Sequence, residues 1–405
     1  MKKRVHDEVV LVSLATLSIL VLSIFLVLTP ASAQTPKPGA WSPGPMPKSL
    51  TVASYDVGGG VYIITAALGE GIFKKFGVRM RSLPVGTGTS RILNVRIGNT
   101  DFGATIDGLF ASEGVYDFAT MDWGPQSLRM IYMSNRQSAY SLATGADSGI
   151  KTLADLKGKK AGWLIGSPFT QLMVTGALAY AGLSLDDVKL VETRSIGSLY
   201  QSLIDGKVDF SPLDSSSSSA YQLESSPRGI YWIPFPPENK EGWDRFRKIN
   251  PQVQPIHCSF GAGLSEKNTV WVATVPMPQY FVYPNADERK VYWIVKMIAE
   301  SYNEYKDISL GMPWHKLEDA MKAYSVLPYH PGAIQYFKER GVWSALLEKN
   351  QAELLDRQAR LQKLWKETVD ESLKTGVKEK DFPDLWMKKR EKEFSNYWVE
   401  SAIKK

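Results

Sequence analysis

The stretch GTGTSRILNVRIGNTDF, Gly86–Phe102, decides the fold because its outline returns as GSLYQSLIDGKVDF at Gly197–Phe210. Each copy reads as a polar loop, a short helix, a glycine, and then Asp-Phe entering a strand. Gly98 and Gly206 stand where a helix end favours a residue that tolerates left-handed dihedral angles. A two-residue Asp-Phe match can arise by chance, but an α/β pattern surrounds both copies. The repeat therefore predicts two related α/β lobes.

The composition is that of a large globular chain. Its 405 residues are 44% hydrophobic and 22% charged, which allows a well-buried core. The net charge of +6 is mild for this length, and the sequence has no Lys/Arg block of the kind that follows phosphates. We therefore expect no nucleic-acid partner.

The first residues resemble an export signal. Three cations within the first four residues precede the apolar run Val9–Leu28, and Ala31–Ala33 supplies the small residues that signal peptidase accepts. We predict a cleaved signal peptide over 1–33. Because about 20 apolar residues can span a bilayer, a membrane anchor through residues 9–28 is the alternative. In both cases the body of the protein is periplasmic, and a Pro-rich linker over 34–48 leads into it.

Two glycine-bearing loops precede helices in the first half of the chain. Leu50–Tyr55 reads as a strand that opens into Gly58–Gly60, and Gly86–Ser90 precedes the next helix, with Thr89 and Ser90 expected to cap it. Free backbone N–H groups and a positive helix end suit an anionic ligand. Neither loop has the further residues of a nucleotide site. A tight connection without any ligand is the plain alternative.

Equivalent features occur in the second half. Gly166–Thr170 precedes a helix, and the predicted strand Val208–Leu213 ends in Asp214 and the serines Ser215–Ser219. A serine run is typical of a solvated flexible loop. Its place after the second Asp-Phe strand corresponds to that of Asp107 after the first, which favours the lining of a cleft.

The sequence indicates no reaction chemistry. The four histidines are too scattered to suggest a metal site. His257 adjoins Cys258, yet no third group completes a nucleophile, and a lone cysteine is more often a small core residue. We expect no catalytic residue, no metal and no cofactor. A secreted hydrolase would need a base paired with a nucleophile and is the weakest alternative.

Five segments match a known family, and they are Gly58–Tyr62, Gly86–Asn94, Gly98–Phe102, Ser148–Lys159 and Leu327–Ala333. Over residues 49–340 the chain resembles a TAXI-family solute-binding subunit of a tripartite ATP-independent periplasmic (TRAP) transporter. The fourth segment is shared across many type II periplasmic binding proteins and so supports the fold more than the family. The family commonly has a Gly-Ser-Gly-Thr-like loop in the second lobe. Here Pro168-Phe169 follows Gly166-Ser167, which leaves the usual amino-acid or dicarboxylate ligand open.

The resemblance implies an α/β, two-lobed, periplasmic binding protein-like (type II) fold with crossover strands and a long C-terminal helical segment. Lobe one would comprise 49–144 and 269–405, and lobe two 145–268. The apolar stripe of the predicted helix Ala345–Leu373 is typical of packing on its own domain rather than of docking a partner. The implied function is delivery of a ligand to a TRAP-type membrane permease. A ligand-sensing module for a membrane receptor would have the same cleft.

The expected ligand is a small organic anion or an amino acid held between the lobes, which would close by hinge motion. Loop amides and hydroxyls at helix starts suit a carboxylate, whereas Asp107 or Asp214 would receive an ammonium or hydroxyl group. We expect the two aspartates to approach the same ligand and the loops to line one pocket. The predicted ligand-binding residues are Gly59, Gly60, Tyr62, Thr87, Gly88, Thr89, Ser90, Asp107, Ser167, Thr170, Asp214 and Ser215.

Overall fold

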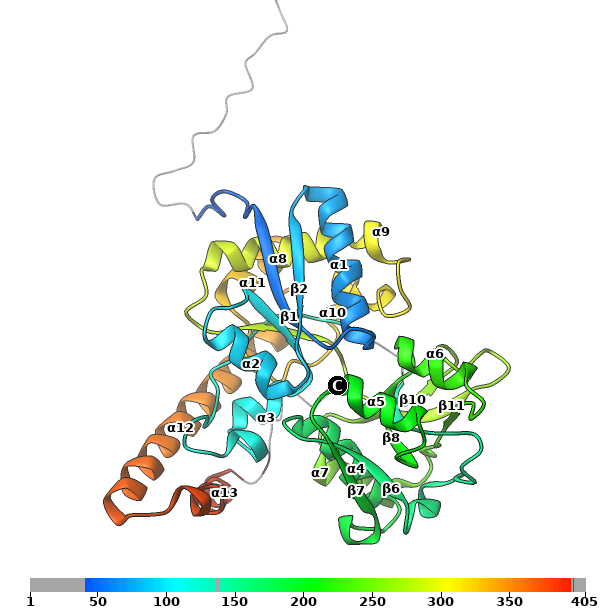
Figure 1. Cartoon of the computed structure of the whole chain (residues 1–405). Helices are drawn as coiled ribbons and strands as arrows, with labels where there is room; N and C mark the ends of the chain where they lie inside the picture. The colour runs from blue at the N-terminus through cyan, green and yellow to red at the C-terminus, as the bar shows by residue number, and fades with distance from the viewer. Residues whose placement is uncertain (1–40, 136–138, 395, 397–405) are drawn as a thin grey trace, which may run out of the picture. The chain divides into compact units, whose positions relative to one another are not determined.

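Two five-stranded sheets with the same strand order organise the protein (Figure 1). The first sheet has the order β2 (Arg79–Pro84), β1 (Ser49–Ser54), β3 (Phe102–Thr105), β12 (Gln279–Val282), β4 (Arg129–Met133). The second has the order β7 (Lys189–Thr193), β6 (Lys160–Leu164), β8 (Phe210–Asp214), β5 (Tyr140–Thr144), β9 (Tyr231–Trp232). In each sheet the first three strands are parallel and the fourth is antiparallel to the third. The two-lobed α/β fold is therefore confirmed.

The computed structural model describes residues 41–135, 139–394 and 396. The predicted signal peptide and residues 34–40 of the linker lie outside the described residues. Among the described helices, none has the length and apolar character needed to cross a membrane. Residues from Pro43 onward form one compact unit, and every contact considered below lies within it.

Matching helices connect the matching strands. In the first lobe, α1 (Gly60–Phe76) joins β1 to β2 and α2 (Gly88–Arg96) joins β2 to β3. In the second lobe, α4 (Pro168–Tyr180) joins β6 to β7 and α5 (Ile196–Ile204) joins β7 to β8. Each lobe thus contains the unit strand, helix, strand, helix, strand. Parallel neighbours require such crossover connections.

The repeated Asp-Phe turn makes equivalent contacts in both lobes. Gly98 and Gly206 adopt φ angles of +77° and +71°, which end the preceding helices without a Cβ penalty. The carboxylate of Asp101 accepts a 2.7 Å hydrogen bond from the N–H of Thr51 in β1. Asp209 accepts an equal bond from the N–H of Lys160 in β6. The aspartate therefore satisfies a donor at the start of the neighbouring strand, while the phenylalanine enters the core.

The strands that cross between the lobes correct two boundaries. Tyr140–Thr144 was assigned to lobe one, but β5 pairs with β8 and β9 in the second sheet, where all five of its residues are buried. The chain also returns to the first sheet later than the predicted boundary at residue 269. β11 (Val270–Thr274) pairs with β10 (Gln254–Cys258) in a separate two-stranded sheet, and the chain rejoins the first sheet only at β12. Sheet membership follows pairing partners, which a local sequence window does not contain.

The remaining helices cover the sheets and extend the C-terminus. They are α3 (Gly108–Glu113), α6 (Ser218–Ser225), α7 (Lys240–Ile249), α8 (Glu288–Glu300), α9 (Tyr302–Tyr305), α10 (Leu317–Ala320), α11 (Pro331–Glu339), α12 (Ala345–Thr375) and α13 (Phe382–Glu393). We call α12 and α13 the C-terminal hairpin, because the two helices pack on each other (Figure 1).

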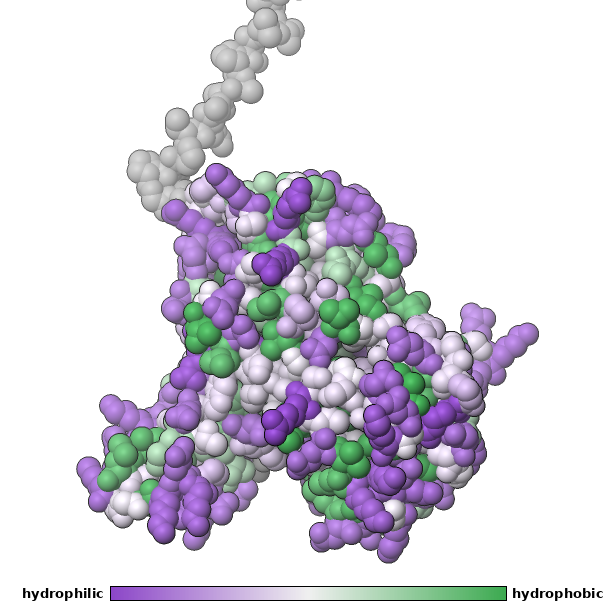
Figure 2. Space-filling view, in the orientation of Figure 1, coloured by the Kyte–Doolittle hydropathy of each residue, from purple (hydrophilic) through white to green (hydrophobic). Residues whose placement is uncertain are grey.

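The apolar stripe of α12 packs inside the protein, as predicted. Leu361 joins Phe382 and Trp386 of α13 in a small core, and Trp365 makes edge contacts with both of those rings at centroid distances of 5.0 and 4.9 Å. Figure 2 shows mostly hydrophilic residues on the visible face, with only small apolar areas between them. Scattered exposed apolar residues of this kind are normal for a folded protein.

Candidate ligand-binding site

Loops from both lobes meet at what we call the interlobe junction, formed by residues 56–60, 86–90 and 105–107 of the first lobe and 166–170, 195–197 and 214–218 of the second. The N–H and hydroxyl of Thr89 donate to the carbonyl of Gly166 at 3.2 and 3.3 Å. The N–H and hydroxyl of Ser218 donate to the carbonyl of Gly58 at 3.1 and 3.0 Å. The predicted loops therefore come together, joined by direct hydrogen bonds.

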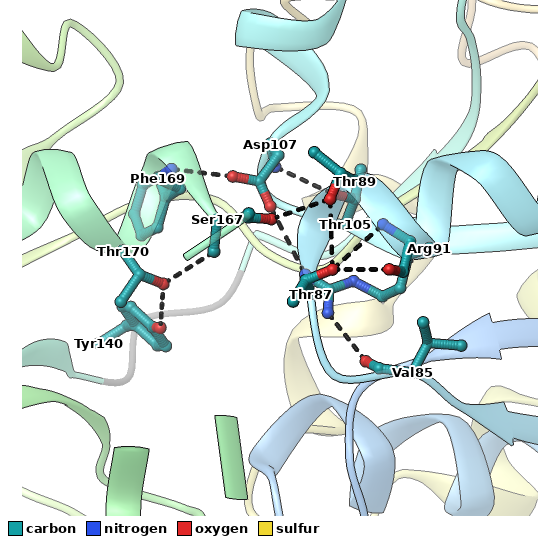
Figure 3. Close-up of polar contacts among 12 residues, drawn as sticks. Val85, Thr87, Thr89, Arg91, Thr105, Asp107, Tyr140, Ser167, Phe169 and Thr170 are labelled. Atoms are coloured by element: carbon teal, nitrogen blue, oxygen red, sulfur yellow. Dashed lines mark hydrogen bonds and ion pairs between the residues drawn. The ribbon is translucent and has the colours of Figure 1, made fainter. Parts of the chain in front are cut away.

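Asp107 lies at the centre of this junction (Figure 3). It follows β3, and its Oδ1 accepts a 2.8 Å hydrogen bond from the N–H of Phe169 in the first turn of α4, across the junction. A Cβ placed on Gly88 would lie only 2.0 Å from Asp107 Oδ2, so glycine is needed there. The carboxylate is fully buried, and burial raises its pKa to about 6, although Arg91 acts in the opposite direction.

Arg91 is the functional candidate that the sequence did not identify. Its side chain is fully buried on α2, with Nη2 3.5 Å from Asp107 Oδ2 and Nη1 donating to the carbonyl of Val85 at 3.2 Å. The guanidinium lies 3.5 Å from the centroid of the Tyr55 ring, a cation–π contact. Its Nε has no hydrogen-bond partner among the described residues. The sequence signal that could have identified Arg91 is an arginine on the inward face of a predicted helix, between the polar loop and the core.

The start of α2 differs from the prediction in one respect. The cap is Thr87, whose hydroxyl accepts from the N–H of Ser90 at 3.2 Å, rather than Thr89 or Ser90. The Thr87 hydroxyl in turn donates to Ser90 Oγ at 2.8 Å. The expectation that Thr89 and Ser90 cap this helix was wrong, because the first helical residue is Gly88 and the cap precedes it. Thr89 instead faces the second lobe.

Asp214 occupies a corresponding position in the second lobe. It ends β8 with 1% of its surface exposed, and its Oδ1 accepts from the N–H and hydroxyl of Ser216 at 3.0 and 3.1 Å. A Cβ on Gly60, at the start of α1 in the first lobe, would lie 2.1 Å from Asp214 Oδ2. Each lobe therefore places an aspartate against the start of a helix in the other lobe. The serine run is ordered, because Ser217 caps α6 through a 3.1 Å bond from the N–H of Ala220.

The other predicted residues divide into two groups. Ser167 and Thr170 lie buried at the start of α4, 3.0 Å apart, and Thr170 also contacts the Tyr140 hydroxyl at 3.3 Å (Figure 3). Gly59 precedes the first helical residue of α1, and Ser215 is buried beside Asp214. Tyr62 is different, since its ring packs against the hydrophobic core.

A sixth loop, residues 195–197, also belongs to the junction, in addition to the five loops predicted from the sequence. The N–H of Gly197, in the first turn of α5, donates to Asp56 Oδ2 of the first lobe at 3.2 Å. The N–H of Ile196 donates to the carbonyl of Gly86 at 3.3 Å. Gly197 begins the second copy of the repeat, as Gly86 begins the first. The repeat could therefore have predicted that the loop at Gly197 belongs to the junction.

The loops that are expected to share one pocket are in direct contact in this structure. The described part of the chain has a 390 Å³ cavity on the second lobe, lined by Tyr231, Trp232, Trp271 and neighbouring prolines, and a 520 Å³ cavity lined by Lys75, Glu300, Lys316 and Arg340 among others. Neither is lined by a predicted site residue. Within the described residues, no group of His, Cys, Asp and Glu side chains is arranged to hold a metal ion. The loops of the junction are closed directly on one another.

These features define a two-lobed α/β protein with its candidate site between the lobes. The chain belongs to the NMT1-like family, whose model matches residues 53–341. No functionally curated protein shows a significant match.

Several solved structures are similar to this chain. The periplasmic binding protein BugD is 12% identical, with coverage of 79% of this chain and 97% of BugD and a TM-score of 0.46. The aliphatic sulphonate binding protein SsuA of Escherichia coli is 17% identical, with 79% and 87% coverage and a TM-score of 0.41. SsuA of Xanthomonas axonopodis pv. citri, bound to MOPS, is 16% identical, with 78% and 95% coverage and a TM-score of 0.42. With TM-scores this low, the fold assignment rests on the sheet order itself.

Proposed function

We propose that the protein is an extracytoplasmic solute-binding protein that captures a small organic anion or amino acid at the interlobe junction. One observation carries this proposal: the starts of α1, α2, α4 and α5 converge there, and buried carboxylates of the opposite lobe already contact two of them. Helix starts present free N–H groups and a partial positive charge, so they suit anionic groups. An acidic group on a ligand would compete with Asp107 for the N–H of Phe169.

Arg91 strengthens this proposal. A fully buried guanidinium held by one carboxylate at 3.5 Å and one carbonyl leaves donor capacity unused. A ligand carboxylate would use that capacity, while Asp107 or Asp214 would accept from an ammonium or hydroxyl group. Gly59, Gly60, Thr87–Ser90, Ser167, Thr170 and Ser215 would supply the surrounding amides and hydroxyls. No covalent step is proposed.

We infer delivery to a TRAP-type permease, with this chain as its TAXI-type binding subunit. The support is the set of sequence segments that resemble that family, together with the predicted export signal. Two lobes that close around a ligand offer a permease two distinguishable surfaces, one open and one closed. A ligand favours closure only through its stronger binding to the closed form.

Thermal unfolding and calorimetric titration of the chain from Gln34 test this proposal. The panel comprises dicarboxylates, amino acids and alkanesulphonates at millimolar concentration. A ligand at about 100 times its dissociation constant should add about 2.7 kcal/mol to the free energy of unfolding. Arg91→Gln should lose that gain, whereas Arg360→Gln, at an exposed ion pair of the C-terminal hairpin, should keep it. The proposal fails if no member binds, or if both variants bind like the parent.

A further inference from the structure

The C-terminal hairpin lies outside the region that defines the family. The family model ends at residue 341, whereas the hairpin begins at Ala345 and contains the longest described helix, α12, of 31 residues. An addition of this size invites the question of what it contacts. Its hydrogen bonds and ion pairs to the rest of the protein reach α3, the loop after it, β4, the segment 325–329 and α11, all associated with the first lobe.

A buried ionic cluster attaches the hairpin to the end of α3. Glu113, the last residue of α3, accepts from Arg357 Nε at 2.6 Å, from Arg357 Nη2 at 2.9 Å and from Arg390 Nη2 at 2.5 Å. The Glu113 side chain is only 3% exposed. Both arginines also donate to the carbonyl of Asn396. One carboxylate is therefore held by two guanidinium groups, in fixed and charge-assisted geometry.

Neutral contacts hold the same end of α3. The indole N–H of Trp386 donates to the carbonyl of Gly114 at 2.6 Å. The amide of Gln358 donates to Ser112 Oγ at 3.4 Å and to the carbonyl of Gln126 at 3.3 Å. All six residues of α3 are buried. The C-terminal end of this helix is thus fixed by the hairpin from several directions.

The other end of α3 is the interlobe junction. Asp107 is the residue before α3, and its carbonyl accepts from the N–H of Ala111 within the helix at 3.0 Å. The same residue accepts from Phe169 across the junction. Six helical residues span about 9 Å, so a short, rigid element joins Glu113 to Asp107.

We propose that Glu113, Arg357, Arg390 and Trp386 are positioning residues, through which the C-terminal hairpin holds α3 so that Asp107 meets α4 and the lobes close. The inference rests on the proposed capture of a ligand between the lobes, because it treats the Asp107–Phe169 contact as part of closure. The hairpin is then a part of the closing mechanism, although it never touches the junction.

The test measures the distance between the lobes without any ligand. Spin labels at Lys74→Cys and Lys157→Cys, both on exposed surfaces of opposite lobes, report that distance in the full chain, since the native Cys258 is buried. Asp107→Ala, which removes the acceptor of the Phe169 N–H, serves as the reference for a lost junction contact. Glu113→Gln removes the ionic attachment, and Trp386→Phe removes only the indole hydrogen bond while keeping a ring in the core. Glu393→Gln, which affects the exposed Arg360 pair, is the matched control.

We expect Glu113→Gln and Trp386→Phe to lose the short-distance population, as Asp107→Ala does, while Glu393→Gln keeps it. Melting curves establish that each variant is folded. Short distances in both hairpin variants, alongside long distances in Asp107→Ala, would mean that the hairpin only stabilises the fold. Unchanged distances in Asp107→Ala would also overturn the inference. Solute capture is judged separately by the ligand titrations, so the two proposals can fail independently.

Discussion

At the residue scale, Asp107 combines full burial with a charge. Its carboxylate has one backbone donor and one distant guanidinium, which is modest compensation for removal from water. Burial is the largest influence on its pKa, and the raised value follows from that balance. The buried, ionised carboxylate of Asp107 therefore lowers the free energy of unfolding at neutral pH. Such unfavourable burial is common where a polar group serves binding.

The pH dependence of stability tests this account of Asp107. Because its pKa rises from 3.8 to about 6 on folding, the folded protein holds the proton more strongly than the unfolded chain. The contribution of this group to the free energy of unfolding therefore falls as pH rises from about 4 to 6, by about 3 kcal/mol. Asp107→Asn lacks this loss, so its stability relative to the parent should increase over that window. Urea unfolding at several pH values measures the difference, and parallel profiles would contradict the assignment.

Two glycines give a second prediction at this scale. Gly88 faces Asp107 of its own lobe, whereas Gly60 faces Asp214 of the other lobe, and a Cβ would lie 2.0 or 2.1 Å from the carboxylate. Opening the lobes relieves only the second clash. Gly88→Ala should therefore lower the free energy of unfolding by about 1–3 kcal/mol. Gly60→Ala should instead shift the protein toward an open form.

Small-angle scattering beside urea unfolding separates the two effects. We expect a larger radius of gyration for Gly60→Ala with little loss of stability, and the reverse for Gly88→Ala. If both variants lose stability equally and neither expands, the contact between Gly60 and Asp214 does not hold the lobes together.

At the element scale, equivalent helices begin with equivalent caps. Thr87 caps α2 by accepting from the N–H of Ser90 at 3.2 Å, and Ser195 caps α5 by accepting from the N–H of Ser198 at 3.1 Å. The two helices are the ones that open the repeated sequence, so the duplication extends to how each helix starts. Thr89, one position beyond Gly88, does not cap α2 and instead donates across the junction to the carbonyl of Gly166.

The caps predict matched losses of stability. Thr87→Ala and Ser195→Ala should each lower the free energy of unfolding by about 1 kcal/mol, the usual value of a side-chain cap. Thr89→Ala should cost less, because its N–H bond to Gly166 remains when the hydroxyl is removed. Urea unfolding compares the three variants. A larger loss for Thr89→Ala than for Thr87→Ala would contradict the cap assignment.

At the scale of the whole molecule, the C-terminal hairpin is integral to the fold even though the family model stops before it. It covers Glu113 and inserts Trp386 beneath the loop that follows α3. Removing it would expose Glu113 and the end of α3, and would remove the shared apolar cluster that contains Ala119. Each large apolar side chain that loses its burial costs about 1.5–3 kcal/mol.

A chain that ends at Gly341 should therefore be less stable by about 2 kcal/mol or more. Circular dichroism during heating measures this against the full chain, and Glu393→Gln controls for loss of a surface ion pair. An unchanged melting temperature would show that the hairpin is an independent appendage.

The duplicated lobes could be predicted from the sequence because the signals are local. A glycine at a helix end acts within one turn of chain, and the Asp-Phe pair that follows it runs directly into a buried strand; both copies carry these signals. The same locality revealed the glycine loops at the starts of α1 and α2, and the apolar stripe of α12. The signal peptide is predicted in the same way, although it lies outside the described residues.

Only the tertiary structure decided which strands cross and which side chains meet. β5 belongs to the second sheet because its partners are β8 and β9, and pairing is not encoded within a strand. Glu113 meets Arg357 across 244 positions, and Phe169 meets Asp107 across 62. Burial of these polar groups required both lobes and the hairpin to be in place, since a charge enters a protein interior only where distant partners compensate it. The sequence determined the two lobes and the loops between them, whereas packing determined the closed junction and what holds it.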